Sequence, residues 1–136
     1  MHTLTEQQAK DRVEEHITDA VAALPVPARL EVQSTDRVPC DDPTDQGPLG
    51  RIIVAKTYWL RDLLAERNKE IFDAVESYWL SHDYRVLDDH RELRVPAFFA
   101  ENNTDAFRMS LQSNVRGDLS ISATSPCVWP NGTPPP

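Results

Sequence analysis

Two histidines and three aspartates within nine residues form the densest group of side chains in this sequence that could do chemistry. They are His82, Asp83, Asp88, Asp89 and His90. Imidazole and carboxylate groups could together bind zinc or another divalent ion, or act as general acid and base in a metal-dependent hydrolase. Their spacing fits no metal signature, a helix C-terminus favours a cation such as His82, and the aspartates are ordinary turn residues. The sequence therefore predicts no catalytic residue, no metal site and no cofactor.

Two weaker candidates lie nearer the N-terminus. Asp41, Asp42 and Asp45 resemble a calcium-binding loop only loosely, because Pro43 occupies the third position and a glycine comes one residue late. We expect a solvated loop there. His16 lies beside apolar residues of an amphipathic stretch, so we expect a partly buried histidine without an obvious partner. The sequence also contains neither a Gly-x-Ser-x-Gly nucleophile motif nor a glycine-rich phosphate loop.

Two aromatic pairs form the candidate interaction surface. They are Tyr58-Trp59 and Tyr78-Trp79, and large amphipathic rings are common at binding interfaces. The alternative is that these rings belong to the core with one edge exposed. Two further segments fit the N-glycosylation pattern, which is common by chance: Asn102-Asn103-Thr104 and Asn131-Gly132-Thr133.

The only two cysteines, Cys40 and Cys127, enclose most of the apolar residues of the chain. A disulfide between them would remove about 4 to 5 kcal/mol of unfolded-state entropy in the chain-entropy model, and it would persist only in an oxidising compartment. The alternative is a pair of independent buried thiols. We predict the disulfide, and with it a location outside the cytosol.

The net charge of −8 argues against two classes of partner, nucleic acid and anionic membrane surfaces, because both need a basic patch. Residues 1–45 carry ten of the acidic side chains and only four basic ones. No apolar run approaches the roughly 18 to 20 residues of a transmembrane helix, and the first residues lack the features of a signal peptide. An exported natural form would therefore need a signal that this sequence does not contain.

The apolar pattern places these residues on two helices and six strands. A capping-box spacing at Thr3 or Thr5 begins a helix that ends at Leu24, before a proline. A second amphipathic helix is predicted over residues 62–82, with Leu64 in its apolar stripe. Alternating or β-branched runs predict strands over residues 29–34, 51–59, 84–87, 93–99, 107–112 and 119–124, with turns over residues 88–91, 101–105 and 114–117.

This order of elements predicts an α+β fold. Two helices would pack on one face of a twisted, mainly antiparallel sheet, giving a two-layer sandwich in the order α-β-β-α-β-β-β-β. Residues 1–129 would form a single domain, followed by a proline-rich tail over residues 130–136. The register of the last hairpin predicts one set of apolar side chains facing the helices and a wet serine and threonine face behind: Phe107, Met109, Leu111, Leu119, Ile121 and Ala123, together with Ile71, Val75 and Trp79 of the second helix.

Residues 30–130 resemble the extracytoplasmic portions of small actinobacterial secreted or lipid-anchored proteins, of the mycobacterial LppA-like lipoprotein kind. The resemblance rests on Cys40, the Glu76–Val86 helix exit, the Asp105-Ala106-Phe107 strand entry and the closing Leu119–Cys127 segment. It implies a location in the cell envelope, an N-terminal lipid anchor that this sequence does not contain, and a disulfide. It implies no catalytic activity.

The sequence thus favours an extracytoplasmic, non-enzymatic accessory or binding domain. Its expected partner is a protein or a small ligand of the cell envelope. One alternative is a small acidic inhibitor or immunity protein that binds a basic partner. Another is a metal-dependent hydrolase that uses His82, His90 and Asp88 or Asp89.

Overall fold

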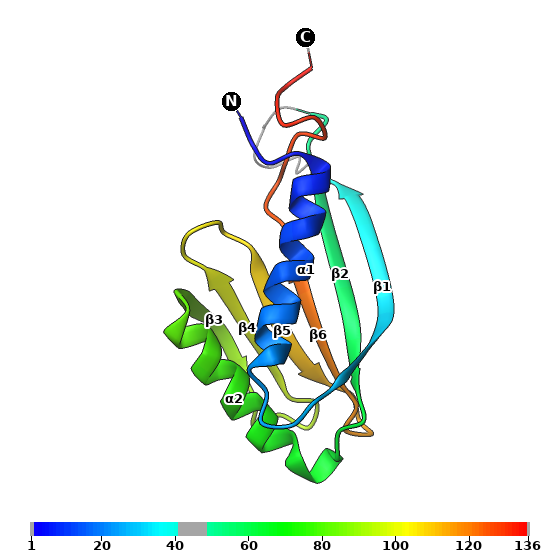
Figure 1. Cartoon of the computed structure of the whole chain (residues 1–136), viewed down its shortest axis with the longest axis vertical. Helices are drawn as coiled ribbons and strands as arrows, with labels where there is room; N and C mark the ends of the chain where they lie inside the picture. The colour runs from blue at the N-terminus through cyan, green and yellow to red at the C-terminus, as the bar shows by residue number, and fades with distance from the viewer. Residues whose placement is uncertain (1, 41–48, 136) are drawn as a thin grey trace.

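The computed structural model describes residues 2–40 and 49–135, which form two helices on one face of a six-stranded antiparallel sheet (Figure 1). The predicted α+β order is confirmed. Its elements are α1 (Glu6–Ala22), β1 (Arg29–Pro39), β2 (Ile52–Arg61), the 3₁₀ turn η1 (Ala65–Arg67), α2 (Asn68–Ser81), β3 (Tyr84–His90), β4 (Ala97–Asn102), β5 (Arg108–Ser113) and β6 (Leu119–Thr124).

The strand order across the sheet is β1-β2-β6-β5-β4-β3, with every pair antiparallel. The last strand therefore inserts between the β1–β2 hairpin and β5. An isolated bridge between Ile52 and Val128 continues this pairing beyond β6. It brings the chain after β6 next to the end of β1, where Cys40 and Cys127 form the predicted disulfide with their Cα atoms 5.8 Å apart.

Strand register assigns one face of the sheet to the core, as predicted. Leu111 lies opposite Ile121, and Met109 lies opposite Ala123. Since residues opposite each other in a ladder project from the same face, these side chains form one apolar layer. The six predicted residues of the hairpin, and the three predicted residues of α2, are each no more than 2% exposed.

The other face of the sheet is covered by no helix of the described residues (Figure 1). It is drier than predicted at β5, because Ser110 is only 6% exposed. Its hydroxyl hydrogen bonds to that of Ser122 at 2.6 Å, and the amide of Gln112 donates to it from the same strand at 3.2 Å. The hydroxyl groups of Ser110 and Ser122 are thus hydrogen-bonded to each other on this face of the sheet.

Helix α1 begins at a capping box. The Thr5 hydroxyl accepts the backbone N–H of Gln8, and the Gln8 side chain accepts the N–H of Thr5. Four apolar residues spaced by three or four positions are buried, so one stripe of α1 packs on the sheet: Ala9, Val13, Ile17 and Ala20.

The predicted start of the second helix was wrong. Residues 62–67 precede α2: Asp62 adopts a left-handed backbone conformation (φ 66°), and η1 follows. Leu64 is 60% exposed and takes no part in the apolar stripe. A left-handed residue breaks an α-helix, so the helical period of the sequence extends further than the helix itself.

The bounds of three strands, β1, β3 and β4, also differ from the prediction, and these strands lie at the sheet edges or next to one. β1 continues to Pro39, and β3 continues through the predicted turn to His90, with a register irregularity after Val86. β4 begins at Ala97, directly after Pro96, and runs to Asn102. Edge strands such as β1 and β3 are exposed on both faces, so their residues lack the alternation from which strands are predicted.

The C-terminal segment that the sequence assigns to a proline-rich tail is tied to the N-terminus. The backbone oxygens of Pro130 and Gly132 accept the N–H groups of Glu6 and Thr3, at 3.0 and 2.9 Å. Trp129, only 2% exposed, donates its backbone N–H to the Thr3 hydroxyl. The two ends of the domain therefore lie together, beside the disulfide.

Candidate functional site

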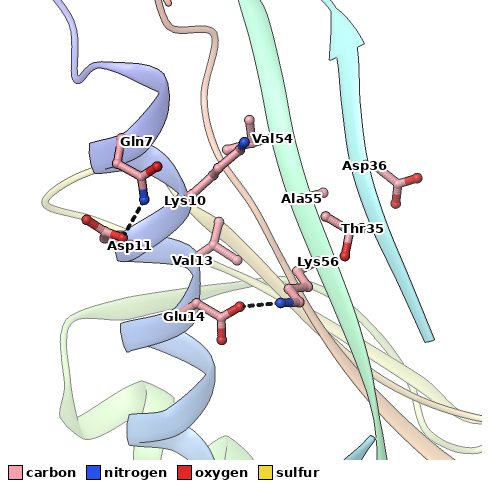
Figure 2. Close-up of a pocket in the computed structure, with 10 residues that line it drawn as sticks. All are labelled: Gln7, Lys10, Asp11, Val13, Glu14, Thr35, Asp36, Val54, Ala55 and Lys56. Carbon is pink, nitrogen blue, oxygen red and sulfur yellow. Dashed lines mark hydrogen bonds and ion pairs between the residues drawn. The ribbon is translucent and has the colours of Figure 1, made fainter. Parts of the chain in front are cut away.

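The candidate site is a groove between α1 and the β1–β2 hairpin, which we call the α1–β2 groove. Helix α1 packs over β2 and β6, whereas β1 lies at the sheet edge, to one side of the helix (Figure 1). The space between them has a volume of about 260 Å³. It is lined by ten residues, shown in Figure 2: Gln7, Lys10, Asp11, Val13, Glu14, Thr35, Asp36, Val54, Ala55 and Lys56.

Two residues that line the groove, Glu14 and Lys56, form a polar cluster with Tyr58. The Lys56 ammonium contacts the Glu14 carboxylate at 2.8 Å, so that a strand and a helix are joined across the groove (Figure 2). The Tyr58 hydroxyl donates to the same carboxylate, at 2.8 and 2.9 Å from its two oxygens. Lys56 lies opposite Ala123 of the core layer, which explains why its side chain projects toward α1.

A second cluster lies beside the groove, nearer the start of α1. One oxygen of Glu6, Oε2, contacts both the Lys10 Nζ at 3.2 Å and the Arg37 Nε at 2.9 Å. Arg37 lies opposite Val54 in the β1–β2 ladder, so its side chain is on the helix side of the sheet. Glu6 is therefore shared by two cations from α1 and from the edge strand.

The contacts of these groups shift their pKa values in directions that keep the ordinary protonation states. The hydrogen bond to Glu14 raises the pKa of Lys56, which therefore stays a cation instead of becoming a nucleophilic amine. Burial raises the pKa of Tyr58, so the phenol stays protonated. The hydrogen bond from Arg37 lowers the pKa of Glu6, which stays a carboxylate. The groove presents fixed charges and hydrogen-bond donors.

His16, for which the sequence suggests no partner, has two. Its Nε2 lies 2.8 Å from an oxygen of Asp105, and its Nδ1 hydrogen bonds to the Tyr84 hydroxyl. Arg12 also contacts Asp105, at 3.3 Å. Burial raises the pKa of Tyr84, so the phenol remains a donor and not a base. This chain of hydrogen bonds fastens α1 to the sheet, and none of its residues lines the α1–β2 groove.

The structure does not bring the two histidines of the predicted cluster together. His82 follows α2, where its ring stacks on Tyr78 with centroids 4.0 Å apart. His90 ends β3, a seven-residue strand that spans roughly 20 Å at about 3.3 Å per residue. Within residues 2–40 and 49–135, no group of three or more His, Cys, Asp or Glu side chains could hold a metal ion.

The aspartates of that cluster have structural partners. Asp83 accepts hydrogen bonds from Asn103 and Thr104, and that from Thr104 contributes most to lowering its pKa. Asp89 binds the Arg91 guanidinium at 2.8 Å, which lowers the pKa of this carboxyl. Asp88 lies 3.9 Å from His90. Asp41, Asp42 and Asp45, for which we expect a solvated loop, lie outside the described residues.

The aromatic pairs do not form one surface. Trp79 is 1% exposed and belongs to the core, which corrects its assignment to an interaction surface. Consecutive residues of a strand point to opposite faces, so Tyr58 faces α1 while Trp59 lies on the uncovered face, under the Arg61 guanidinium at 4.8 Å. Tyr78 is half-buried against His82.

The two glycosylation motifs differ in accessibility. Asn102 is 8% exposed, and its side-chain oxygen accepts the backbone N–H groups of Thr104 and Asp105. The Asn102 side chain therefore stabilises the turn that follows β4. Asn131 is exposed.

Sequence reasoning missed the residues that form the groove. The spacing of Glu6 and Lys10 (i, i+4) is visible in the sequence, and so is the single lysine, Lys56, within the apolar run of β2. Neither signal locates Arg37, which reaches Glu6 only because β1 folds beside α1.

Compared with protein-family models, with curated proteins and with solved structures, this chain has no significant match in any of the three. Among the described helices, none is long and apolar enough to cross a membrane.

Proposed function

We propose that this protein is an extracytoplasmic, non-enzymatic binding domain of the cell envelope, and that the α1–β2 groove is where it meets a partner protein. The observation that carries the proposal is the groove itself, across which Lys56 and Glu14 pair, with the Tyr58 hydroxyl donating to the same carboxylate. Its hydrogen bond to Glu14 raises the pKa of Lys56, and burial raises the pKa of Tyr58. Such a set can recognise a polar partner, but it offers no activated nucleophile or base.

The location outside the cytosol is supported by the disulfide. Cys40 and Cys127 are joined, and disulfides of this kind persist in oxidising compartments. We expect the protein in its native host to resist thiol labelling until a reductant is added. Two cysteines that label without reductant would contradict this part of the proposal.

Site-specific cross-linking tests the binding site. A photoreactive amino acid is introduced at one of two positions, and the protein is irradiated in the native cell envelope. Position 35 (Thr35) lines the groove, whereas position 69 (Lys69) lies on α2 with a side chain that is 92% exposed. We expect a discrete cross-linked protein from position 35 that is lost with Lys56→Gln, and none from position 69. Adducts that are the same from both positions, or unaffected by Lys56→Gln, would refute the groove as the binding site.

A second candidate function, a small acidic inhibitor of a basic protein, is favoured by the charge of the helical layer. Helix α1 carries five acidic and two basic residues, and residues 65–81 carry four acidic and two basic. If the protein is such an inhibitor, a photoreactive amino acid at the exposed position of Glu15 on α1 should cross-link to the basic partner. The affinity of the two proteins for each other should fall about tenfold or more between 50 and 500 mM salt.

A further inference from the structure

We infer that Lys10 and Arg37 form a binding site for a carboxylate group at the end of the α1–β2 groove. The inference rests on the proposed function of the groove and adds the chemistry of its ligand. It starts from one shared atom: Glu6 Oε2 contacts both the Lys10 Nζ and the Arg37 Nε. Because both contacts are made to one oxygen, the two nitrogens lie at most about 6 Å apart. A single carboxylate can bridge such a pair.

The cluster of Glu6, Lys10 and Arg37 is cationic by itself, within a groove whose other charged residues, Asp11, Glu14, Asp36 and Lys56, are net acidic. Two cations share one carboxylate, and the Arg37 guanidinium keeps Glu6 ionised by lowering its pKa, so the cluster has one positive charge in excess. That excess matches a monovalent carboxylate. A phosphate dianion would leave a surplus of negative charge close to Asp11 and Glu14, which also line the groove.

Unused donors face solvent in the cluster. Lys10 has three N–H donors and Arg37 has five, whereas the described residues give each of them Glu6 as its one partner. Their side chains are 47% and 54% exposed, and that of Glu6 is 21% exposed. Figure 2 shows the Lys10 side chain reaching from α1 across the groove toward Val54. Val13 and Val54, each 2% exposed, lie beneath the polar side chains that line the groove.

The site consists of exposed ion pairs, which contribute little to stability, about 0 to 1 kcal/mol each. Its residues can therefore be changed without unfolding the protein. The test variant is the double substitution Lys10→Gln and Arg37→Gln. Its matched control is Lys69→Gln and Arg116→Gln, since these side chains are 92% and 83% exposed on other elements.

The experiment is a titration of the oxidised protein with acetyl-Ala-Ala, either as free acid or as amide, followed by backbone amide NMR shifts. We expect the acid to shift the signals of residues 7–10, 35–37 and 54–56 along a saturating curve in the millimolar range, and the amide to leave them in place. The double variant should bind at least about tenfold more weakly, and the control should match the wild type. The same titration with acetyl-Ala-Glu amide separates a side-chain carboxylate from a chain terminus as the source.

Several outcomes would overturn the inference: equal shifts with acid and amide, no shift up to about 50 mM, equal weakening in the control, or tighter binding of inorganic phosphate than of the acid. This failure can be told apart from failure of the proposed function. A cross-link at position 35 without carboxylate binding would retain the groove and reject its ligand. Carboxylate binding without a specific cross-link would retain the ligand site and reject the partner protein.

Discussion

At the level of single residues, the hydrogen-bonded chain Asp105–His16–Tyr84 is the part of the molecule that most resembles a catalytic arrangement. With His16 neutral and its proton on Nε2, the ring donates to Asp105 and accepts from Tyr84, so both ring nitrogens are occupied. Tyr84 is 6% exposed. A substrate would have to displace a buried phenol to reach the ring, and we therefore interpret the chain as a polar fastening of α1.

His16→Ala should destabilise the protein by about 1 to 3 kcal/mol, because it removes the ring that hydrogen bonds to the buried Tyr84 hydroxyl and to Asp105, which would keep its contact with Arg12. Tyr84→Phe in the same background should recover part of the loss, since it removes the unsatisfied hydroxyl. Urea unfolding of the two single variants and the double variant measures this coupling. The exposed His82→Ala is the control and should stay within about 0.5 kcal/mol of the wild type. A purely additive double variant would contradict the interpretation.

A second prediction concerns the buried carboxylate of Glu101, which receives the Arg108 Nε at 2.8 Å and also contacts Arg85. These partners, Arg108 first, hold the pKa of Glu101 below its usual value. A carboxyl group with a lowered pKa in the folded state stabilises the fold above its unfolded pKa of about 4.3. This stabilisation is lost as the pH falls through the lowered value.

Glu101→Gln should therefore lower the free energy of unfolding at pH 7 and reduce the loss of stability between pH 5 and the acid transition. Chemical denaturation at a series of pH values measures both effects. Glu15→Gln, an exposed change on α1, serves as the control. An unchanged pH profile in Glu101→Gln would show that the arginine pairs do not contribute to the folded state.

Residue types alone could not reveal these sites. His16 is separated from its partners by 89 and 68 residues, so only the fold, which brings α1 to Tyr84 at the start of β3 and to Asp105 in the β4–β5 turn, joins them. The sequence signal for a site was strongest at residues 82–90, where imidazoles and carboxylates are close in the chain. A β-strand then separates the two histidines, because closeness in sequence along an extended strand means distance in space.

At the level of elements, the sequence predicted best where one face of a helix or strand is buried. The β5–β6 hairpin has a strict apolar alternation and matches its predicted register, since a slip by one residue would expose the whole layer. At the edges this constraint is absent, and β1 and β3 were both predicted too short. Both edge strands have a register irregularity, a feature that hinders an edge strand from pairing with a strand of another molecule. The apolar pattern of the sequence does not predict where such irregularities lie.

The β5–β6 turn and η1 are coupled by one close contact. Gly117 has a φ of +86°, and a Cβ built on it would lie 2.9 Å from the Ala65 Cβ. Gly117→Ala should therefore cost more than about 1 kcal/mol, from backbone strain and from the clash together. Ala65→Gly in the same protein should recover only the part due to the clash. Thermal unfolding of the three variants measures this, and complete recovery would show that the backbone conformation carries no strain.

At the level of the whole molecule, the net charge is distributed unevenly between the helices and the sheet. The described strands and connections carry ten acidic and ten basic side chains, so the acidic excess of the described residues lies on the helical layer. The strands and connections together are therefore electrically balanced, whereas the two helices carry the net negative charge. The Lys10–Arg37 pair is an exception to this layer, at the side of α1 that faces β1.

The disulfide joins the end of the edge strand β1 to the segment after β6, which lies two positions along the sheet. Cys127 follows β6 and Cys40 follows β1, so the bond closes a loop with a sequence separation of 87. Reduction should lower the free energy of unfolding by about 2 to 5 kcal/mol, mostly through the greater freedom of the unfolded chain. The far-UV circular dichroism of the folded state should be preserved, because the sheet, the core and the contacts of Pro130 and Gly132 with the N-terminus remain. Cys40→Ser with Cys127→Ser provides a reductant-free measurement of the same loss. A variant that melts at the wild-type temperature would show that the strand pairing alone holds these ends together, while one that never folds would show that the core is too weak without the covalent link.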